Sequence, residues 1–194
     1  MEQKKTSKKY QNGSSLQTQI LNGINKLADN VASTLGPRGR NVILHNKGSR
    51  PIITKDGVTV ANFVELEDPF ENVGAQILKQ AADETNSLAG DGTTTSTVLA
   101  RHILNDSQKY LATGANPVEI KRGMDKALDA VVKKLEASSK PVSSVSDIEN
   151  VATISANGDK AIGRLIATAV DQIGKDGSIT VESGRAMETK LDVV

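Results

Sequence analysis

Apolar residues recur at every third or fourth position along several long segments, and this spacing constrains the fold more than any other feature. It places the apolar side chains on one face of an α-helix. The pattern covers residues 14–35, 68–89, 93–113 and 116–135. Only 2% of the residues are aromatic, so the core must be built from aliphatic side chains. Because that composition suits packed helices better than an aromatic-rich β-sandwich, the sequence predicts a mainly α, multihelical fold.

Start and stop signals bound these helices. Asp68, Pro69 and Glu71 supply an N-cap, a first-turn proline and an acidic N3 residue, so the two acids can cap the backbone reciprocally. Gly36 and Pro37 end the first helix, because proline cannot continue it. The side chains expected to face inward are Phe70, Val73, Ile77, Ala81, Thr85 and Leu88 in the second helix and Ile103, Tyr110 and Leu111 in the third.

A small β-hairpin is expected between the first two helices. Residues 41–44 and 51–54 are short β-prone runs, and the turn signal Gly48-Ser49 lies between them. Residues 58–64 are a third β candidate, which reads either as a strand or as irregular structure.

A Ser-Ser-Lys-Pro break at residues 138–141 divides the chain into residues 1–139 and 140–194. The second part is expected to be a small α+β segment. It would hold a helix opened by Ser146, a helix closed by Gly174 and a strand over residues 178–182. The apolar run at 191–194 would leave a sheet edge unpaired, so the sequence reads as cut inside an element.

Charge and composition limit the classes of partner and the compartments to be expected. The formal net charge of +1 gives no reason to expect nucleic acid. The one basic cluster reads as a solvated tail and comprises Lys4, Lys5, Lys8 and Lys9. The absence of cysteine fits a reducing compartment. No apolar run approaches the ~18 residues that span a bilayer, and no secretory signal is visible, so a soluble cytoplasmic protein without a membrane partner is expected.

The most informative stretch is residues 90–95 (Gly-Asp-Gly-Thr-Thr-Thr). Three threonines at a helix start run against helix propensity. A helix N-terminus offers backbone amides and a partial positive charge to phosphates, and glycines allow close approach. Asp91 can hold a hard cation that bridges phosphate oxygens. The alternative is an ordinary helix start with Asp91 as its N-cap, and the pattern alone leaves both readings open.

Two other stretches carry the same ambiguity. Residues 34–40 hold two glycines and two arginines, which could cradle an anion or simply end a helix. Lys55 can reach a phosphate and Asp56 a cation or water, but Asp56-Gly57 also reads as a tight turn. The sequence has no P-loop, dinucleotide-binding or kinase motif. His45 and His102 stand apart from any metal-ligand cluster and read as surface or structural residues.

Taken together, these stretches resemble the N-terminal part of a group I chaperonin subunit of the GroEL family. The order and spacing of residues 34–42, 53–58, 65–72 and 90–95 carry the resemblance. Residues 116–117, 121–123, 153–157 and 177–182 extend it, so that it covers the chain from about Tyr10 onward.

The resemblance implies an ATP-dependent molecular chaperone with an ATPase activity that uses Mg²⁺, with K⁺ as a further cation. Lys55 would lie near the phosphates, Asp91 would bind magnesium, and Asp56 would assist hydrolysis. The nucleotide would contact Thr34, Leu35, Gly36 and Pro37, and the phosphates would lie on Gly92, Thr93, Thr94 and Thr95. The family's partners are unfolded polypeptides, a co-chaperonin lid and the other subunits of a seven-membered ring.

By the same resemblance, residues 1–139 correspond to the first part of an equatorial ATP-binding domain and residues 140–194 to the first part of an intermediate domain. The apical domain, which holds unfolded polypeptide, would follow. The chain is therefore expected to be an N-terminal portion of a subunit, near-inactive as an ATPase alone. The alternative is a split-subunit or interaction fragment that needs a second chain. A mitochondrial or plastid matrix is the alternative to the cytoplasm.

Overall fold

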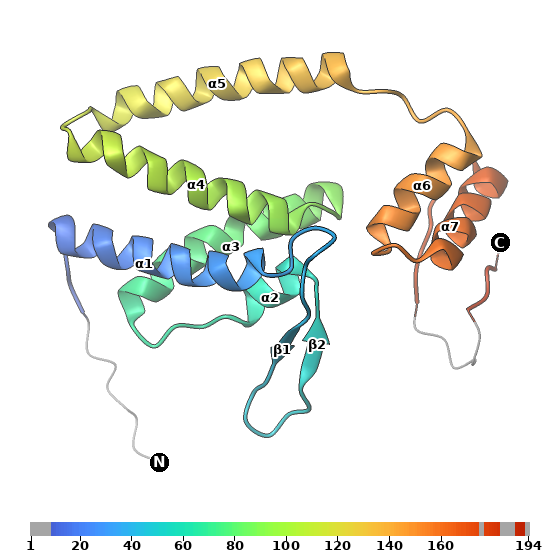
Figure 1. The fold of residues 1–194 in the computed structure, drawn as a ribbon, viewed down its shortest axis with the longest axis horizontal. Helices are drawn as coiled ribbons and strands as arrows, with labels where there is room; N and C mark the ends of the chain where they lie inside the picture. The colour runs from blue at the N-terminus through green and yellow to red at the C-terminus, as the bar shows by residue number, and fades with distance from the viewer. Residues whose placement is uncertain (1–8, 175–176, 183–188, 193–194) are drawn as a thin grey trace. The chain divides into compact units, whose positions relative to one another are not determined.

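The computed structural model describes residues 9–174, 177–182 and 189–192. Outside these described residues lie Lys4, Lys5 and Lys8 of the basic cluster and the last two residues of the apolar run at 191–194. The elements, in chain order, are α1 (Gly13–Ala32), β1 (Val42–Leu44), β2 (Ile52–Thr54), α2 (Gly57–Phe63), α3 (Pro69–Ala89), α4 (Thr93–Ala112), α5 (Pro117–Ser138), α6 (Val145–Ser155) and α7 (Lys160–Ile173) (Figure 1). The predicted mainly α fold with a small β-hairpin is confirmed.

The chain divides into two compact units, Met1–Asp125 and Lys126–Val194. This division falls inside α5, whereas the boundary predicted after residue 139 lies beyond that helix, so the domain assignment stays a prediction. None of the described helices is long and apolar enough to cross a membrane.

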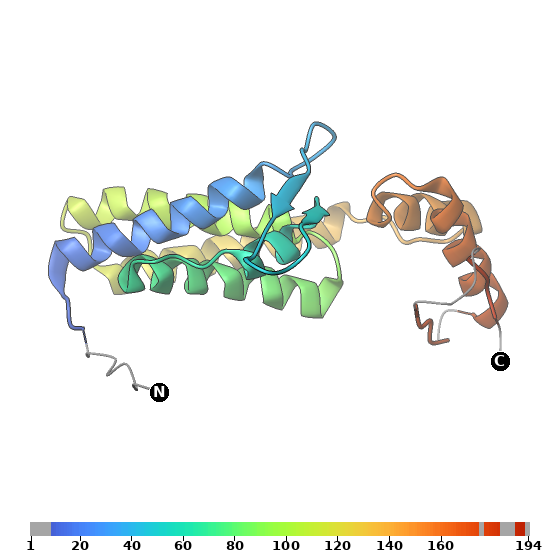
Figure 2. The ribbon, with the colours of Figure 1, turned by 90° about the horizontal axis from the view of Figure 1, so that it is seen from below.

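The first unit is built on a close crossing of α1 and α3, which lie side by side (Figures 1 and 2). A Cβ atom at Gly23 would overlap the backbone of Glu71, and one at Gly74 would overlap the backbone of Ile20. Two glycines thus allow the two backbones to touch. The core around the crossing consists of Ile24, Leu27, Ala28, Val31, Val60, Ala61, Ala75, Leu78 and Ala82.

The predicted inward face of α3 is wrong by about one residue, or ~100° around the helix. Val73, Ile77 and Leu88 are 47%, 43% and 79% exposed. The buried residues of α3 are Gly74, Ala75, Leu78, Lys79 and Ala82. The close crossing explains the difference, because Gly74 on that face lets the α1 backbone approach at Ile20.

Asp68 caps the start of α3 as predicted, whereas the predicted reciprocal cap by Glu71 is replaced by an ion pair. The Asp68 carboxylate accepts hydrogen bonds from the amides of Phe70 and Glu71, both at 2.9 Å. The Glu71 carboxylate lies 2.5 Å from the Lys26 ammonium of α1, so it joins two helices.

Of the third β candidate, residues 58–63 are helical in α2 and Val64 is its C-cap, so the strand reading is wrong. The Asp56 carboxylate caps this helix by accepting from the Thr59 amide at 2.8 Å. Val60 and Ala61 are fully buried in the core, and this burial outweighs the modest β-preference of the segment.

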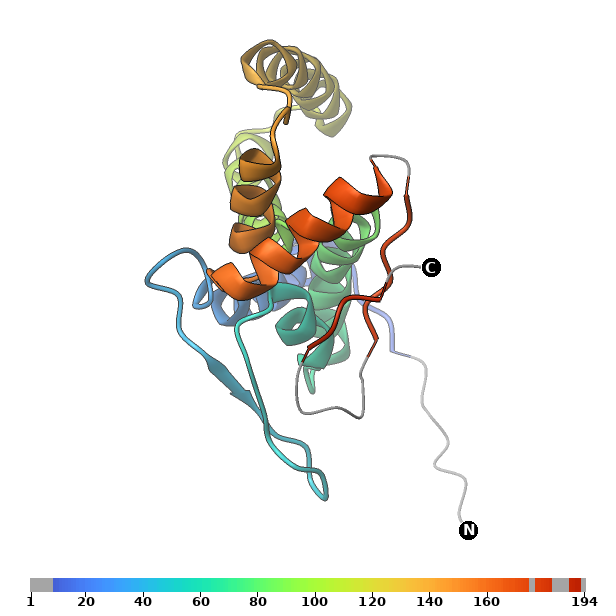
Figure 3. The same ribbon diagram turned by 90° about the vertical axis from the view of Figure 1, so that its right-hand side faces the viewer.

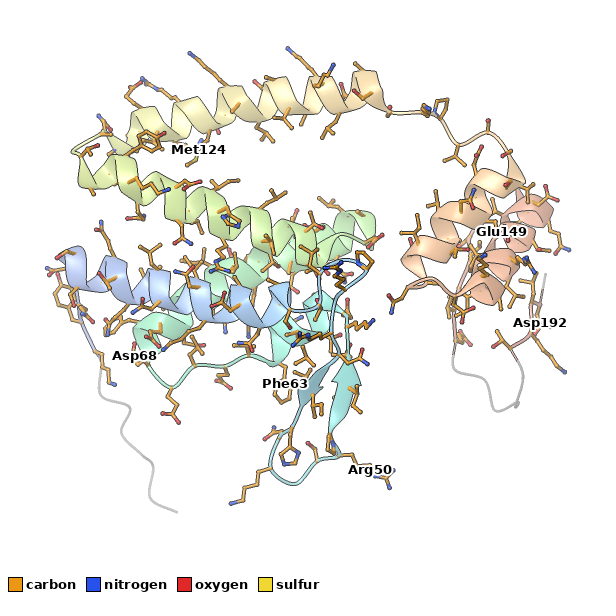
Figure 4. All side chains as sticks on the ribbon, viewed as in Figure 1. Arg50, Phe63, Asp68, Met124, Glu149 and Asp192 are labelled. Carbon is orange, nitrogen blue, oxygen red and sulfur yellow. The ribbon has the colours of Figure 1, made fainter. Side chains whose placement is uncertain are left out.

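The β-hairpin has the predicted strands, with Val42 opposite Thr54 and Leu44 opposite Ile52. Leu44 is buried, whereas Ile43 on the other face is 68% exposed. The hairpin extends away from the helices, and Arg50 lies near its tip (Figures 3 and 4).

The expectation that Ile103 and Tyr110 of α4 face inward is wrong, since they are 51% and 61% exposed; Leu111 is partly buried. The buried residues of α4 are Thr93, Thr97 and Ser107. The fully buried positions of this helix therefore carry hydroxyl groups, while Ala100 and Leu104 pack partly buried against the core. α5 begins after Asn116 as predicted, where the Asn116 side chain accepts from the Val118 amide at 2.9 Å, and none of its residues is buried.

In the second unit α6 packs against α7, and Gly163 lets the two approach at Thr153. α6 begins at Val145, one residue before the predicted Ser146, and Ser144 with Asp147 forms its capping box. Gly174 ends α7 as predicted. The predicted strand over residues 178–182 does not form, because no other segment of the described chain pairs with it.

Candidate functional site

Three predicted segments meet at the N-terminus of α4. A Cβ atom at Gly57, the first residue of α2, would overlap the Thr94 hydroxyl and lie 2.9 Å from the Thr94 backbone nitrogen. The hydroxyls of Thr34 and Thr94 are 3.3 Å apart. The end of α1, the start of α2 and the start of α4 are therefore in direct contact.

The hydroxyl groups at this junction have a defined direction. The Thr34 hydroxyl donates to the Val31 carbonyl at 2.8 Å. A hydroxyl carries one hydrogen, so the Thr94 hydroxyl is the donor in its 3.3 Å contact with Thr34. The lone pairs of the Thr94 oxygen consequently point away from Thr34. The backbone amides of the first turn of α4 have no partner within the helix, so they can donate to a ligand.

The loop before α4 departs from an ordinary capped start. Gly90 and Gly92 have φ angles of 69° and 82°, which glycine adopts without strain. The N-cap residue is Gly92 and not Asp91, and it provides no side-chain cap. The Asp91 carboxylate accepts from the Gly92 amide at 2.6 Å. The N-cap residue of α4 thus provides no side-chain cap, whereas the N-cap residues of α2, α3, α6 and α7 all do.

Lys55 and Asp56 occupy the junction between β2 and α2, and both are exposed. One oxygen of Asp56, Oδ2, accepts from both the Thr59 amide at 2.8 Å and the Thr59 hydroxyl at 2.5 Å. Asp56 therefore has a structural role as the N-cap of α2, a role that the sequence reading missed. The spacing of Asp56 and Thr59 is the signal that could have revealed it.

The Gly36 loop folds back tightly on the end of α1. Gly36 has a φ of 71°, and its carbonyl accepts from the Gly39 amide at 2.9 Å. The Arg40 amide donates to the Ser33 carbonyl at 2.8 Å. Thr34 is buried by this loop, whereas Leu35 is 44% exposed.

The structure thus brings together some of the predicted site residues and not others. The Thr34 hydroxyl contacts the Thr94 hydroxyl. Gly57 lies against both Thr93 and Thr94, and Asp56 precedes it in the sequence. The remaining predicted residues flank these contacts along the chain: Leu35, Gly36, Pro37, Lys55, Asp91, Gly92 and Thr95. Within the described part of the chain, no group of three or more acidic or histidine side chains could hold a metal ion.

An apolar hollow in the second unit does not belong to this site. It lies between α6 and α7 and is lined by Val142, Ile148, Ala152, Ile162 and Ile166, among others. Phosphates need donors and positive charge, which these aliphatic side chains do not supply.

Two solved structures with a similar fold are chaperonins. A group III chaperonin in the open state has a TM-score of 0.69 at 24% identity, and the match covers 81% of this chain and 32% of that one. Chaperonin gp146 from the bacteriophage EL 2 (Pseudomonas aeruginosa), in the presence of ATP–BeFx, has a TM-score of 0.67 at 29% identity. That match covers 81% of this chain and 28% of gp146. The fold is that of the chaperonin class.

Residues 27–192 match the TCP-1/cpn60 chaperonin family as a whole. The chain belongs to that family. It spans less than a third of the length of the two solved chaperonins, at 32% and 28%.

Proposed function

We propose that this chain supplies the phosphate-binding part of an ATP-dependent chaperonin subunit of group I type. The observation that carries the proposal is the meeting of Thr34, Gly57 and Thr94 at the start of α4, whose N-cap residue Gly92 has no side chain. Backbone amides and the positive end of the α4 dipole favour phosphate there. Membership of the family supports ATP as the nucleotide, and the motifs of the sequence favour group I over the other groups.

Each predicted residue has a role in this proposal. Asp91 would hold Mg²⁺, which would offset the negative charge of the phosphates, with K⁺ as a further cation. The ammonium of Lys55 adds positive charge near the phosphates, and Asp56 assists the attack of water. The first turn of α4 receives the phosphates, and the Gly36 loop contacts the rest of the nucleotide.

The activity of a complete subunit extends this proposal. It would bind unfolded polypeptides, cooperate with a co-chaperonin lid and assemble with identical subunits in a seven-membered ring. The proposed compartment is the cytoplasm. For this chain by itself we propose nucleotide binding with very slow hydrolysis, because Asp56 alone leaves the attacking water poorly oriented.

Replacing Asp91 tests the binding step. Asp91→Ala should weaken Mg²⁺-dependent ATP binding by at least about tenfold in isothermal titration calorimetry, because the cation loses its protein ligand. Asp129→Ala, which removes an exposed carboxylate from α5, is the matched control and should bind like the wild type. Equal affinity of the wild type and Asp91→Ala would remove Asp91 from the site.

A further inference from the structure

The apolar part of the contact of α4 with the core is small, since its hydrophobic residues there, Ala100 and Leu104, are only partly buried. All nine buried residues of the core cluster come from α1, α2 and α3. The hydroxyls of Thr97 and Ser107, two of the three buried residues of α4, donate to carbonyls of α4 itself. Apolar burial is non-directional, so it only weakly fixes how far α4 slides along α1.

Four polar side chains bridge the two helices, and we name them the Asn25 cluster: Asn25 and Asp29 of α1 with Arg101 and Asn105 of α4. Asn105 Nδ2 donates to Asn25 Oδ1 at 2.8 Å, and Asn25 Nδ2 donates to Asn105 Oδ1 at 3.4 Å. Arg101 Nε donates to Asn25 Oδ1 at 3.0 Å. The Asn25 oxygen therefore accepts two hydrogen bonds, which fill its lone pairs and fix the orientation of the amide.

Arg101 extends the cluster along α1. Its Nη1 atom lies 2.7 Å from Asp29 Oδ1, so one guanidinium contacts two side chains that are one helical turn apart. The planar guanidinium has separate donors for both contacts, whereas a lysine ammonium is a single point. With only 26% of the Arg101 side chain exposed, the pair is partly shielded from water.

The Asn25 cluster and the Thr34–Thr94 contact agree on one register. α1 and α4 run antiparallel (Figure 1). Asn25 precedes Thr34 by about 14 Å of helix rise, and Arg101 and Asn105 follow Thr94 by about 10 and 17 Å. A slide of α4 by one turn, ~5.4 Å, would break every bond of the cluster and separate Thr94 from Thr34.

We propose that the Asn25 cluster sets the register of α4 on α1 and so places the first-turn threonines of α4 against Thr34. Arg101 and Asn105 are then positioning residues for nucleotide binding, and this second clause rests on the proposed function. Polar groups that select one register are well attested at buried positions between packed helices, and Asn25, Arg101 and Asn105 are partly buried here.

Spin-label distances test the register directly. The sequence has no cysteine, so Asn22→Cys on α1 and Leu99→Cys on α4, both exposed, can carry nitroxides. Pulsed dipolar spectroscopy should give one narrow distance in the otherwise wild-type chain. Arg101→Met should add a population shifted by about 5 Å, one helical turn, or broaden the distribution to that width. Arg101→Lys should lie between the two.

The matched control is Arg122→Met, which removes an arginine–carboxylate pair within α5 and joins no other helix. It should leave the distance unchanged. Asn105→Ala removes only one amide and carries the same test if Arg101→Met does not fold. A distance distribution in Arg101→Met or Asn105→Ala that equals the control overturns the proposed register role.

Nucleotide affinity tests the positioning role. Arg101→Met should weaken Mg²⁺–ATP binding by about tenfold, and Arg122→Met should not change it. Because Arg101 acts through the threonines, Arg101→Met should cost less than about twofold once Thr94→Ala is present; equal losses in both backgrounds overturn the role. If the wild type does not bind Mg²⁺–ATP, the proposed function fails, while the spin-label distances still decide the register.

Discussion

Replacing Gly57 by alanine perturbs the closest contact of the candidate site. Gly57 lacks a positive φ angle, so its backbone conformation suits alanine. The new methyl group would overlap the Thr94 hydroxyl, and it would lie 2.9 Å from the Thr94 nitrogen and 3.1 Å from the Thr93 hydroxyl. The effect of the substitution therefore comes from the contact between α2 and α4.

Two opposing terms set the magnitude. Alanine is better than glycine inside a helix by up to about 1 kcal/mol, although less at the first helical position. Overpacking a buried contact costs about 1–3 kcal/mol, because neighbouring backbone must move. We expect Gly57→Ala to lower the free energy of unfolding by about 1–2 kcal/mol. A displacement of α2 or of Thr94 by about 1 Å would also weaken Mg²⁺–ATP binding by about tenfold or more.

Gly123→Ala is the matched control. Gly123 lies inside α5, and its added Cβ would meet no atom within 4 Å. Only the propensity gain remains, so this variant should be more stable than the wild type by up to about 1 kcal/mol, with unchanged affinity. Urea unfolding followed by circular dichroism, together with calorimetric titration of Mg²⁺–ATP, measures both effects. If Gly57→Ala matches Gly123→Ala in stability and affinity, the start of α2 does not contact α4 as described.

Two other predictions concern single carboxylates. Asp56→Asn should keep α2 folded, since asparagine is an equally good N-cap, but should lower the rate of any ATP hydrolysis by about tenfold or more; an unchanged rate in a phosphate-release assay would exclude Asp56 from the chemistry. The Ser144 hydroxyl, followed by the Ser144 and Ser143 amides, holds the pKa of Asp147 below its ordinary value. The stabilisation of α6 is therefore present above the ordinary aspartate pKa and is lost as pH falls through the lowered value. Ser144→Ala should raise the NMR titration midpoint of Asp147, and an unmoved midpoint would contradict the assigned cause.

Local signals allowed the sequence to predict where most elements begin and end. The Asp68 cap, the Asn116 cap and the turn at Gly48 each involve residues within three or four positions of one another, so they can be recognised from the local sequence. The face that a helix buries was less predictable. For α3 it depends on the crossing of Gly23 and Gly74, which lie far apart in the sequence.

The candidate site shows the same limit. Its segments could be grouped from the sequence because their order and spacing resemble a known family. Their contacts could not be predicted, because the residue that touches Thr94 is Gly57, which has no side chain to suggest a role. The N-cap role of Asp56 and the direction of the Thr34 hydroxyl likewise depend on folded geometry.

The distribution of apolar burial has a consequence for ligand affinity. Thr34 follows α1, which is held in the core with α2 and α3, whereas Thr93 and Thr94 belong to α4, which adds no residue to the buried core cluster. The α4 half of the site therefore depends on the partly buried Ala100 and Leu104 together with a few directional polar bonds. A ligand that needs both halves binds only the population in which α4 is in register, so its apparent affinity falls with that fraction. By linkage, the same ligand favours that register, which makes α4 the helix whose position should respond most to nucleotide.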